Sequence, residues 1–136
     1  MNWKLIFSLS LFGLAMAVAT SFFLSVHSEV YVWPFIMIIT AYFIAKNRGN
    51  YFSHGILTGL LNSIWIDIFH VIFFTSFMAL NADMADKWHW PLAGHIRLNL
   101  VIVGLCIGLI SGIVLGILAW LIGLVVNKKQ AATTTE

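Results

Sequence analysis

The chain alternates between long apolar segments and short polar breaks. Residues 5–28 and 30–45 contain no Lys, Arg, Asp or Glu, and the apolar stretch 54–80 contains one such residue, Asp67. A helix needs about 20 predominantly apolar residues to cross a hydrocarbon core about 30 Å thick. The pattern therefore predicts an all-α integral membrane protein, a four-helix bundle that forms a single domain over residues 1–130. The expected spans are about 5–27, 30–46, 53–80 and 96–126, followed by a disordered polar tail over 131–136.

The basic residues predict how the chain is oriented. With four crossings, the basic residues on one side are Lys4, Lys46, Arg48, Lys128 and Lys129, and those on the other are Lys87 and Arg97. The positive-inside rule then places both termini in the cytoplasm, and we expect a multi-pass protein of the bacterial inner membrane. A cleaved signal peptide, with small residues at 15–19, is the alternative for the first segment. The apolar run continues past that site to Leu24, which favours a retained helix.

The composition indicates lipid surroundings. Hydrophobic residues make up 61% of the 136 residues and charged residues 9%, whereas about a quarter of a soluble domain is charged. The net charge of +2 and the lack of a basic run longer than Lys128-Lys129 do not favour nucleic-acid binding. The single cysteine, Cys106, lies in an apolar run and has no partner for a disulfide within the chain.

Small residues recur at helical spacing in the first and last spans. Those of the last span are Gly104, Gly108, Ser111, Gly112 and Gly116, and those of the first are Ser10, Gly13, Ala17, Thr20 and Ser21. Close packing of small residues drives much of helix association in lipid. We expect these two stripes to pack against each other or against copies of the chain. A homo-oligomer or a larger membrane partner is therefore among the expected assemblies.

The polar side chains of the third span form two groups on a helical wheel. One face carries Gly59, Ser63, Asp67 and His70, and the other carries His54, Thr58, Asn62 and Trp65. Because both faces need partners, we expect this helix to be central in the bundle.

A carboxylate within a membrane span is energetically costly and marks a candidate site. Asp67 and His70 are one turn apart, so they can form either a neutral acid beside a neutral base or an ion pair. Exchange between these states would make a proton relay, with Ser63 on the same face. The alternative is structural, with Asp67 bonded to Ser63, His70 or another helix. We expect Arg97 to extend to the headgroups rather than down to Asp67.

Metal binding and catalysis receive little support from the sequence. Candidate ligands between spans are His27, Glu29, Asp83, Asp86, His89 and His95. They show neither HxxxH nor HExxH spacing, so solvated residues and no metal or other cofactor are expected. A hydrolase with Ser63 as nucleophile is disfavoured because side chains stacked along one helix face do not converge on a substrate atom. We therefore expect a protein that is not an enzyme.

Two functions remain open from the sequence. The first is a small non-enzymatic packing or assembly component with glycine-striped helices. The second is a transporter or channel subunit in which Asp67, His70 and Ser63 handle protons or a cation. The two hypotheses differ in whether Asp67 faces a polar cavity or is sealed between side chains.

Overall fold

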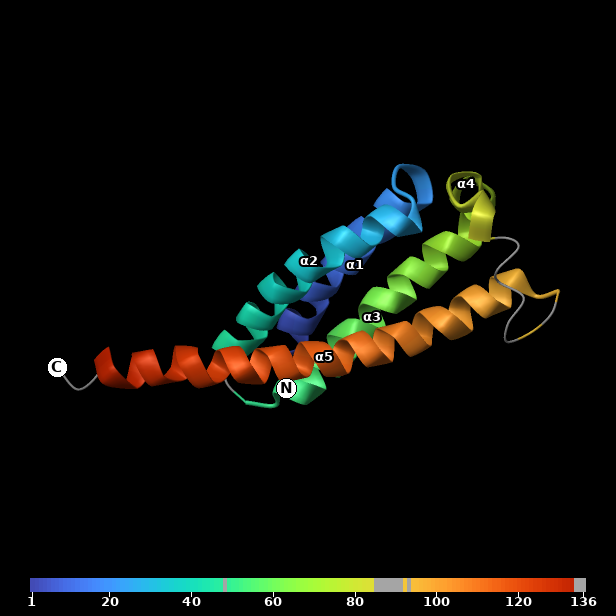
Figure 1. Cartoon of the computed structure of the whole chain (residues 1–136). Helices are drawn as coiled ribbons and strands as arrows, with labels where there is room; N and C mark the ends of the chain where they lie inside the picture. Colours follow the sequence, from blue (N-terminus) through green and yellow to red (C-terminus); the bar gives the residue numbers. More distant parts are fainter. Residues whose placement is uncertain (48, 85–91, 93, 134–136) are drawn as a thin grey trace.

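The computed structural model describes residues 1–47, 49–84, 92 and 94–133, and side chains up to residue 126. The long helices are α1 (Trp3–Phe22), α2 (Val26–Lys46), α3 (Tyr51–Ile72) and α5 (Ile96–Thr133). Between α3 and α5 lie the short helix α4 (Phe74–Leu80) and a 3-10 turn, η1 (Ala82–Met84). The four long helices are long and apolar enough to cross a membrane, α5 over Ile96–Val126. The predicted all-α bundle of four spans is thereby confirmed (Figure 1).

The second span begins earlier than predicted. Helix α2 starts at Val26, so the polar residues 27–29 form its first turn rather than a break. Ser25 is extended at the N-cap position, and the backbone N–H of Val26 donates to Asn81 Oδ1 over 2.8 Å. Glu29 in this first turn is favourably placed relative to the helix dipole. The span is therefore 21 residues long, about the length that a crossing requires.

The third span is shorter than predicted because its helix breaks at Phe73. The backbone of Phe73 leaves the helical region at φ −98° and ψ 33°, and α4 then packs against α1. Phe77 of α4 is buried against His70, and Phe73 contacts the ring of Phe22. Asp67 consequently lies five residues before the end of α3, about 8 Å along the axis. Asp67 therefore lies towards one end of its helix, and not at the middle of a continuous helix over the predicted span 53–80.

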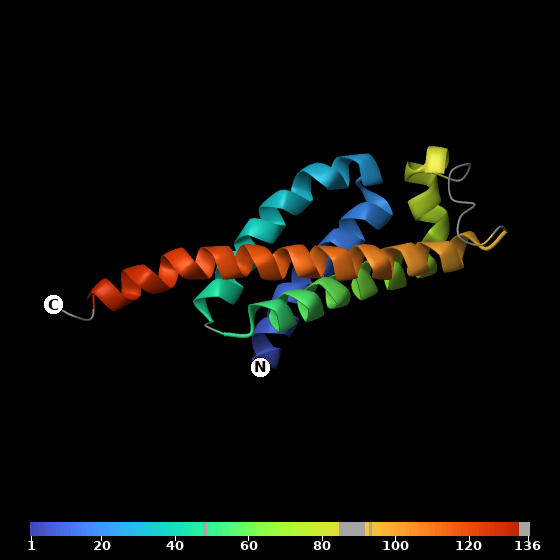
Figure 2. The same cartoon turned by 60° about the horizontal axis from the view of Figure 1, so that its bottom comes forward.

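Helix α3 is central, as its two polar faces predicted. It packs mainly against α5 on one side and α1 on the other, while α2 packs against α5. Figure 2 shows α3 running beside α5 along its length. The small-residue stripes of α1 and α5 both pack mainly on α3, so the prediction that they pack against each other within the chain is wrong.

Different contacts hold the helices together at the two ends of the bundle. At the N-terminal end, Asn2 donates through Nδ2 to Asn47 and through its backbone N–H to His54 Nε2. Nearby, a buried apolar cluster joins α1, α2 and α5 and consists of Leu9, Ala41, Ile44, Leu115 and Ala119. At the opposite end, Asn81 links α4 to the start of α2. The first turn of α5 lies at this opposite end, because Arg97 lies over the Phe74 ring.

Helix α5 extends beyond the rest of the bundle at its C-terminal end (Figure 1). Its 38 residues correspond to about 57 Å, nearly twice the thickness of a hydrocarbon core. The helix continues to Thr133, whereas the sequence predicted a disordered tail from residue 131. The Lys, Gln and Ala residues there have high helix propensity, which explains the continuation. Residues 134–136 lie outside the described part of the chain.

Candidate functional site

The site is built on a close contact between α3 and α5. The two helices are antiparallel, and glycines of α5 oppose small residues of α3 at intervals of four. A Cβ added to Gly59 would lie 2.6 Å from Cα of Gly112, and one added to Gly112 would lie 2.8 Å from Cα of Ile56. At these positions, no side chain separates the two backbones. Gly55, which the sequence analysis did not single out, makes the same kind of contact with Gly116.

Asp67 occupies space that Gly104 leaves open. A Cβ at Gly104 would overlap the Asp67 carboxyl group, and a Cβ at Gly108 would overlap the Ser63 hydroxyl group. The Asp67 residue is 6% exposed. Its Oδ2 atom is buried and has no hydrogen-bond partner among the residues that the structure describes. Burial of an ionised carboxylate without a partner is unfavourable, so this atom is available to a proton or a ligand.

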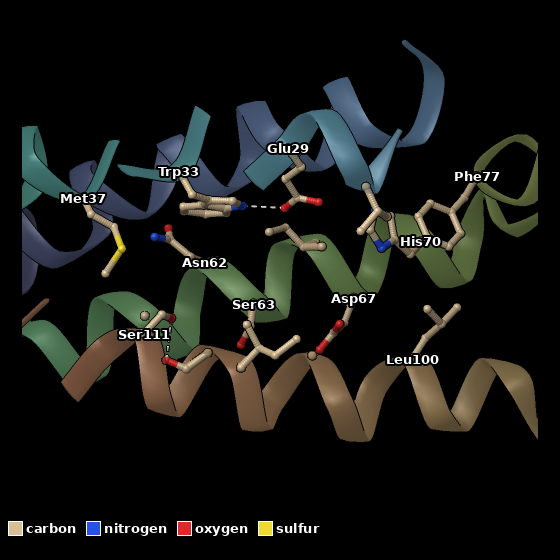
Figure 3. Close-up of a pocket in the computed structure, with 16 residues that line it drawn as sticks. Glu29, Trp33, Met37, Asn62, Ser63, Asp67, His70, Phe77, Leu100 and Ser111 are labelled. Carbon is tan, nitrogen blue, oxygen red and sulfur yellow. Dashed lines mark hydrogen bonds between the residues drawn. The ribbon is translucent and has the colours of Figure 1, made fainter. Parts of the chain in front are cut away.

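Asp67 lines a pocket of about 310 Å³ between α2, α3 and α5, and Phe77 of α4 also lines it. Figure 3 shows Glu29 and Trp33 on the α2 side, Asn62, Ser63, Asp67 and His70 along α3, and Leu100 and Ser111 on α5. The other residues that line it are Val26, Met37, Gly59, Ile66, Gly104, Ile107 and Gly108. Most of these side chains are apolar, and the polar ones come chiefly from α3.

Glu29 and Trp33 form the polar part of the α2 wall. Glu29 Oε1 accepts a hydrogen bond from Trp33 Nε1 over 2.5 Å (Figure 3). The sequence analysis placed Glu29 with the solvated residues between spans, because it began the second span at residue 30. The spacing of Glu29 and Trp33, four residues apart, is the signal that would have placed both on one helix face.

His70 is held by α1 and α4 rather than by Asp67. The Thr20 hydroxyl donates to the Met16 carbonyl over 2.8 Å, so its oxygen accepts from His70 Nε2, also over 2.8 Å. The ring is stacked on Phe77 with the centroids 4.0 Å apart. Within the described residues, no hydrogen bond joins Asp67 to His70. Both side chains nevertheless line the same pocket, as does Ser63.

Ser63 is engaged locally. Its hydroxyl donates to the Leu60 carbonyl of the same helix over 2.9 Å. In the described part of the chain it has no hydrogen bond to His70, so the three candidate residues do not form a nucleophile and base pair. The shared feature of Ser63, Asp67 and His70 is the pocket that they line.

The second polar face of α3 contacts α1. Gly13 donates its backbone N–H to Asn62 Oδ1 over 3.2 Å, and a Cβ at Gly13 would overlap Asn62. Trp65 Nε1 donates to Ser10 Oγ, and Ala17 is fully buried. These contacts join the two helices, and they place Asn62 where it also lines the pocket.

Most of the other candidate ligands lie away from the pocket. His27 Nε2 lies 3.1 Å from Asp83 Oδ2, and both side chains are exposed. His95 is exposed, while Asp86 and His89 lie outside the described residues. Arg97 does not extend to Asp67, since its guanidinium lies 4.8 Å above the centroid of the Phe74 ring. The described residues contain no group of three His, Cys, Asp or Glu side chains that could hold a metal ion.

The fold and the pocket define a class: an all-α four-helix bundle whose long helices are apolar enough to cross a membrane, with a pocket between three of them that two carboxyl groups line. Comparisons with protein-family models, with curated proteins and with solved structures found no match for the chain.

Proposed function

We propose that this protein is a small multi-pass membrane transporter or channel subunit that handles protons or a cation at Asp67. The observation that carries the proposal is the buried Asp67 Oδ2 atom, which lacks a hydrogen-bond partner among the described residues and lines a pocket. A carboxylate that served only to join helices would be expected to bond to a neighbouring helix. Asp67 instead lies against Gly104, which offers no side chain to bond.

The alternative role as a packing or assembly component receives less support. The glycine stripe of α5 that suggested it lies against α3 of the same chain. The stripe of α1 also lies against α3, with Gly13 on Asn62. Small residues that already pack within the chain do not require a partner to explain them.

A non-enzymatic role is part of the proposal. The hydroxyl of Ser63 bonds to a backbone carbonyl, and Nε2 of His70 bonds to Thr20. Neither residue is arranged to activate the other as a nucleophile and base. The pocket is better suited to binding than to covalent chemistry.

We further propose that both termini face the cytoplasm and that the host membrane is a bacterial inner membrane. In support, Asn2 contacts Asn47, so the N-terminus and the α2–α3 turn share one end of the bundle. Tyr51 of α3 lies near Gly123, so the C-terminal part of α5 returns to that end. Lys4 and Lys46 lie at this end as well, in agreement with the positive-inside rule. Asp67 is then in the outer part of the bilayer.

The proposal is tested by reconstituting the full chain into liposomes and measuring proton, Na⁺ and K⁺ flux under an imposed membrane potential. We expect flux above that of protein-free liposomes, and we expect Asp67→Asn to abolish it because the amide cannot exchange a proton or balance a cation. Asp83→Asn is the matched control, since it removes an exposed carboxylate at the same end of the bundle.

Two results would contradict the proposal. One is wild-type protein that gives no flux for any of the three ions. The other is flux that Asp67→Asn leaves unchanged while the variant is incorporated in the same amount as the wild type.

A further inference from the structure

The pocket carries acidic groups without a matching basic side chain. Asp67 enters from α3 and Glu29 from α2, so two carboxyl groups from different helices line one cavity. Among the described residues that line it, none is Lys or Arg. Arg97, the basic residue placed nearest along α5, packs over Phe74. When these carboxyl groups are ionised, no Lys or Arg of the described lining balances their charge, and a cation bound in the pocket would do so.

Within the described residues, His70 forms neither a hydrogen bond nor an ion pair with Asp67. Its Nε2 atom bonds to Thr20, and its ring is stacked on Phe77. The ring lines the pocket beside Phe77, and Asp67 Oδ2 remains without a partner in the described structure.

The remaining walls do not suit a bare divalent metal ion. Hard cations such as Ca²⁺ take six to eight oxygen ligands, and Mg²⁺ needs an octahedral set. Here most lining residues are apolar, including Met37, Ile66, Leu100 and Ile107. Trp33 adds an aromatic ring whose indole N–H is already bonded to Glu29. Walls of this kind favour the apolar body of a ligand, with a few polar groups to fix its orientation.

We propose that the pocket binds a small organic cation with an aromatic or other apolar body, such as a substituted ammonium ion. Its charge faces Asp67 and Glu29, and its body lies against Trp33 and the apolar side chains of α3 and α5. Aromatic rings attract such cations through their electron-rich faces. The volume of about 310 Å³ is at the lower end of the range of about 300–1,000 Å³ for small-molecule pockets. This inference rests on the proposed function and names the ligand class for the same site.

The test is calorimetric titration of the full chain in lipid nanodiscs, with empty nanodiscs as the blank. Three soluble probes separate charge from apolar body: benzyltrimethylammonium has both, tetramethylammonium has the charge alone, and phenylacetate has the ring with the opposite charge. We expect saturable binding of benzyltrimethylammonium, binding of tetramethylammonium weaker by roughly tenfold or more because the ring is missing, and no binding of phenylacetate.

Single substitutions test which residues bind the cation. Asp67→Asn is expected to weaken benzyltrimethylammonium binding by roughly tenfold or more, because the charge partner is removed from a poorly solvated site. Glu29→Gln should weaken it as well, whereas the exposed control Asp83→Asn should leave it unchanged. The probe series on the wild-type chain does not depend on the folding of any variant.

The outcomes separate this inference from the proposed function. If benzyltrimethylammonium does not bind the wild type, or if tetramethylammonium binds equally well, the organic-cation inference is overturned. Asp67-dependent flux of protons or inorganic ions alongside that result would leave the proposed function standing. Binding that depends on Asp67 without any ion flux would instead support the site and overturn the transport function.

Discussion

Single buried polar side chains form the hydrogen bonds that join neighbouring helices of this protein. Asn62 accepts from the backbone of Gly13, His70 bonds to Thr20, and Asn81 accepts from the backbone of Val26. In lipid, where apolar contact alone gives little preference for one neighbour, such bonds select which helices meet. Asp67 differs from these residues because its Oδ2 atom has no such bond in the described structure.

Asn81 provides a direct test of this role. It is fully buried, its Oδ1 atom accepts from Val26, and its Nδ2 group donates to the Phe77 carbonyl over 2.9 Å. Asn81→Ala should lower the free energy of unfolding by about 1–3 kcal/mol, because it leaves two backbone groups without partners. Denaturation by SDS in mixed micelles measures the change. Asn47→Ala, which removes a more exposed bond to Asn2, should have a much smaller effect, and an equal effect of both substitutions would contradict this role.

The sequence identified Asp67 but missed the roles of Glu29 and Asn81. An acidic residue within an apolar span is conspicuous because its burial is costly. Glu29 was missed because it lies next to a helix boundary, where an error of four residues moved it out of the bundle. Asn81 was missed because its partner Val26 is 55 residues away, and no local pattern reports such a contact.

The contact between α3 and α5 is the main contact between helices in the bundle. Glycines on both helices bring the two backbones together, from Gly55 with Gly116 to Gly59 with Gly112. Towards the opposite end of the bundle, the α3 partner changes from glycine to Ser63 and then Asp67. The same stripe therefore packs the helices at one end and accommodates the acidic side chain at the other.

This difference along the stripe predicts two kinds of glycine variant. Gly59→Ala and Gly112→Ala should each lower the free energy of unfolding by about 1–3 kcal/mol, because the new Cβ meets backbone that cannot move alone. Gly104→Ala should change stability less and impair flux and cation binding, because its Cβ meets the movable end of Asp67. SDS denaturation and the flux assay measure the two effects.

Val114→Ala, at an exposed position of α5, is the control for these glycine variants. If Gly104→Ala proves as destabilising as Gly112→Ala and leaves flux intact, the division of the stripe into packing and site positions is wrong.

The sequence predicted the positions of the long helices well, but it predicted poorly which helices pack against each other. Long apolar runs are sufficient to define spans, since a backbone in lipid must satisfy its hydrogen bonds within a helix. A stripe of small residues does not identify its partner, and α1, α3 and α5 all carry one. The break at Phe73 was not predictable from breaker residues, because residues 70–76 contain neither Gly nor Pro. At the break, Phe73 contacts the ring of Phe22 and Phe77 is stacked on His70, contacts between residues that no local pattern reports.

In the molecule as a whole, the pocket results from the way in which α2 packs against α5. Their buried apolar contact lies near the N-terminal end, where Ala41 and Ile44 join Leu115 and Ala119. Farther along α2, towards its N-terminus, the side chains that line the pocket are Met37, Trp33, Glu29 and Val26. Phe77 of α4 also lines it. The bundle is therefore closely packed at one end and hollow at the other, with Asp67 in the hollow part.

The most direct test of this account is site-resolved labelling of Asp67 with dicyclohexylcarbodiimide, an apolar reagent that condenses with protonated carboxyl groups. The full chain is labelled in liposomes, with and without saturating benzyltrimethylammonium, and the adduct is located by peptide mass spectrometry. We predict an adduct at Asp67 that forms more slowly when the cation is present, because both occupy the same pocket. An Asp67 that stays unlabelled, or one that is labelled equally fast with and without the cation, would contradict the account.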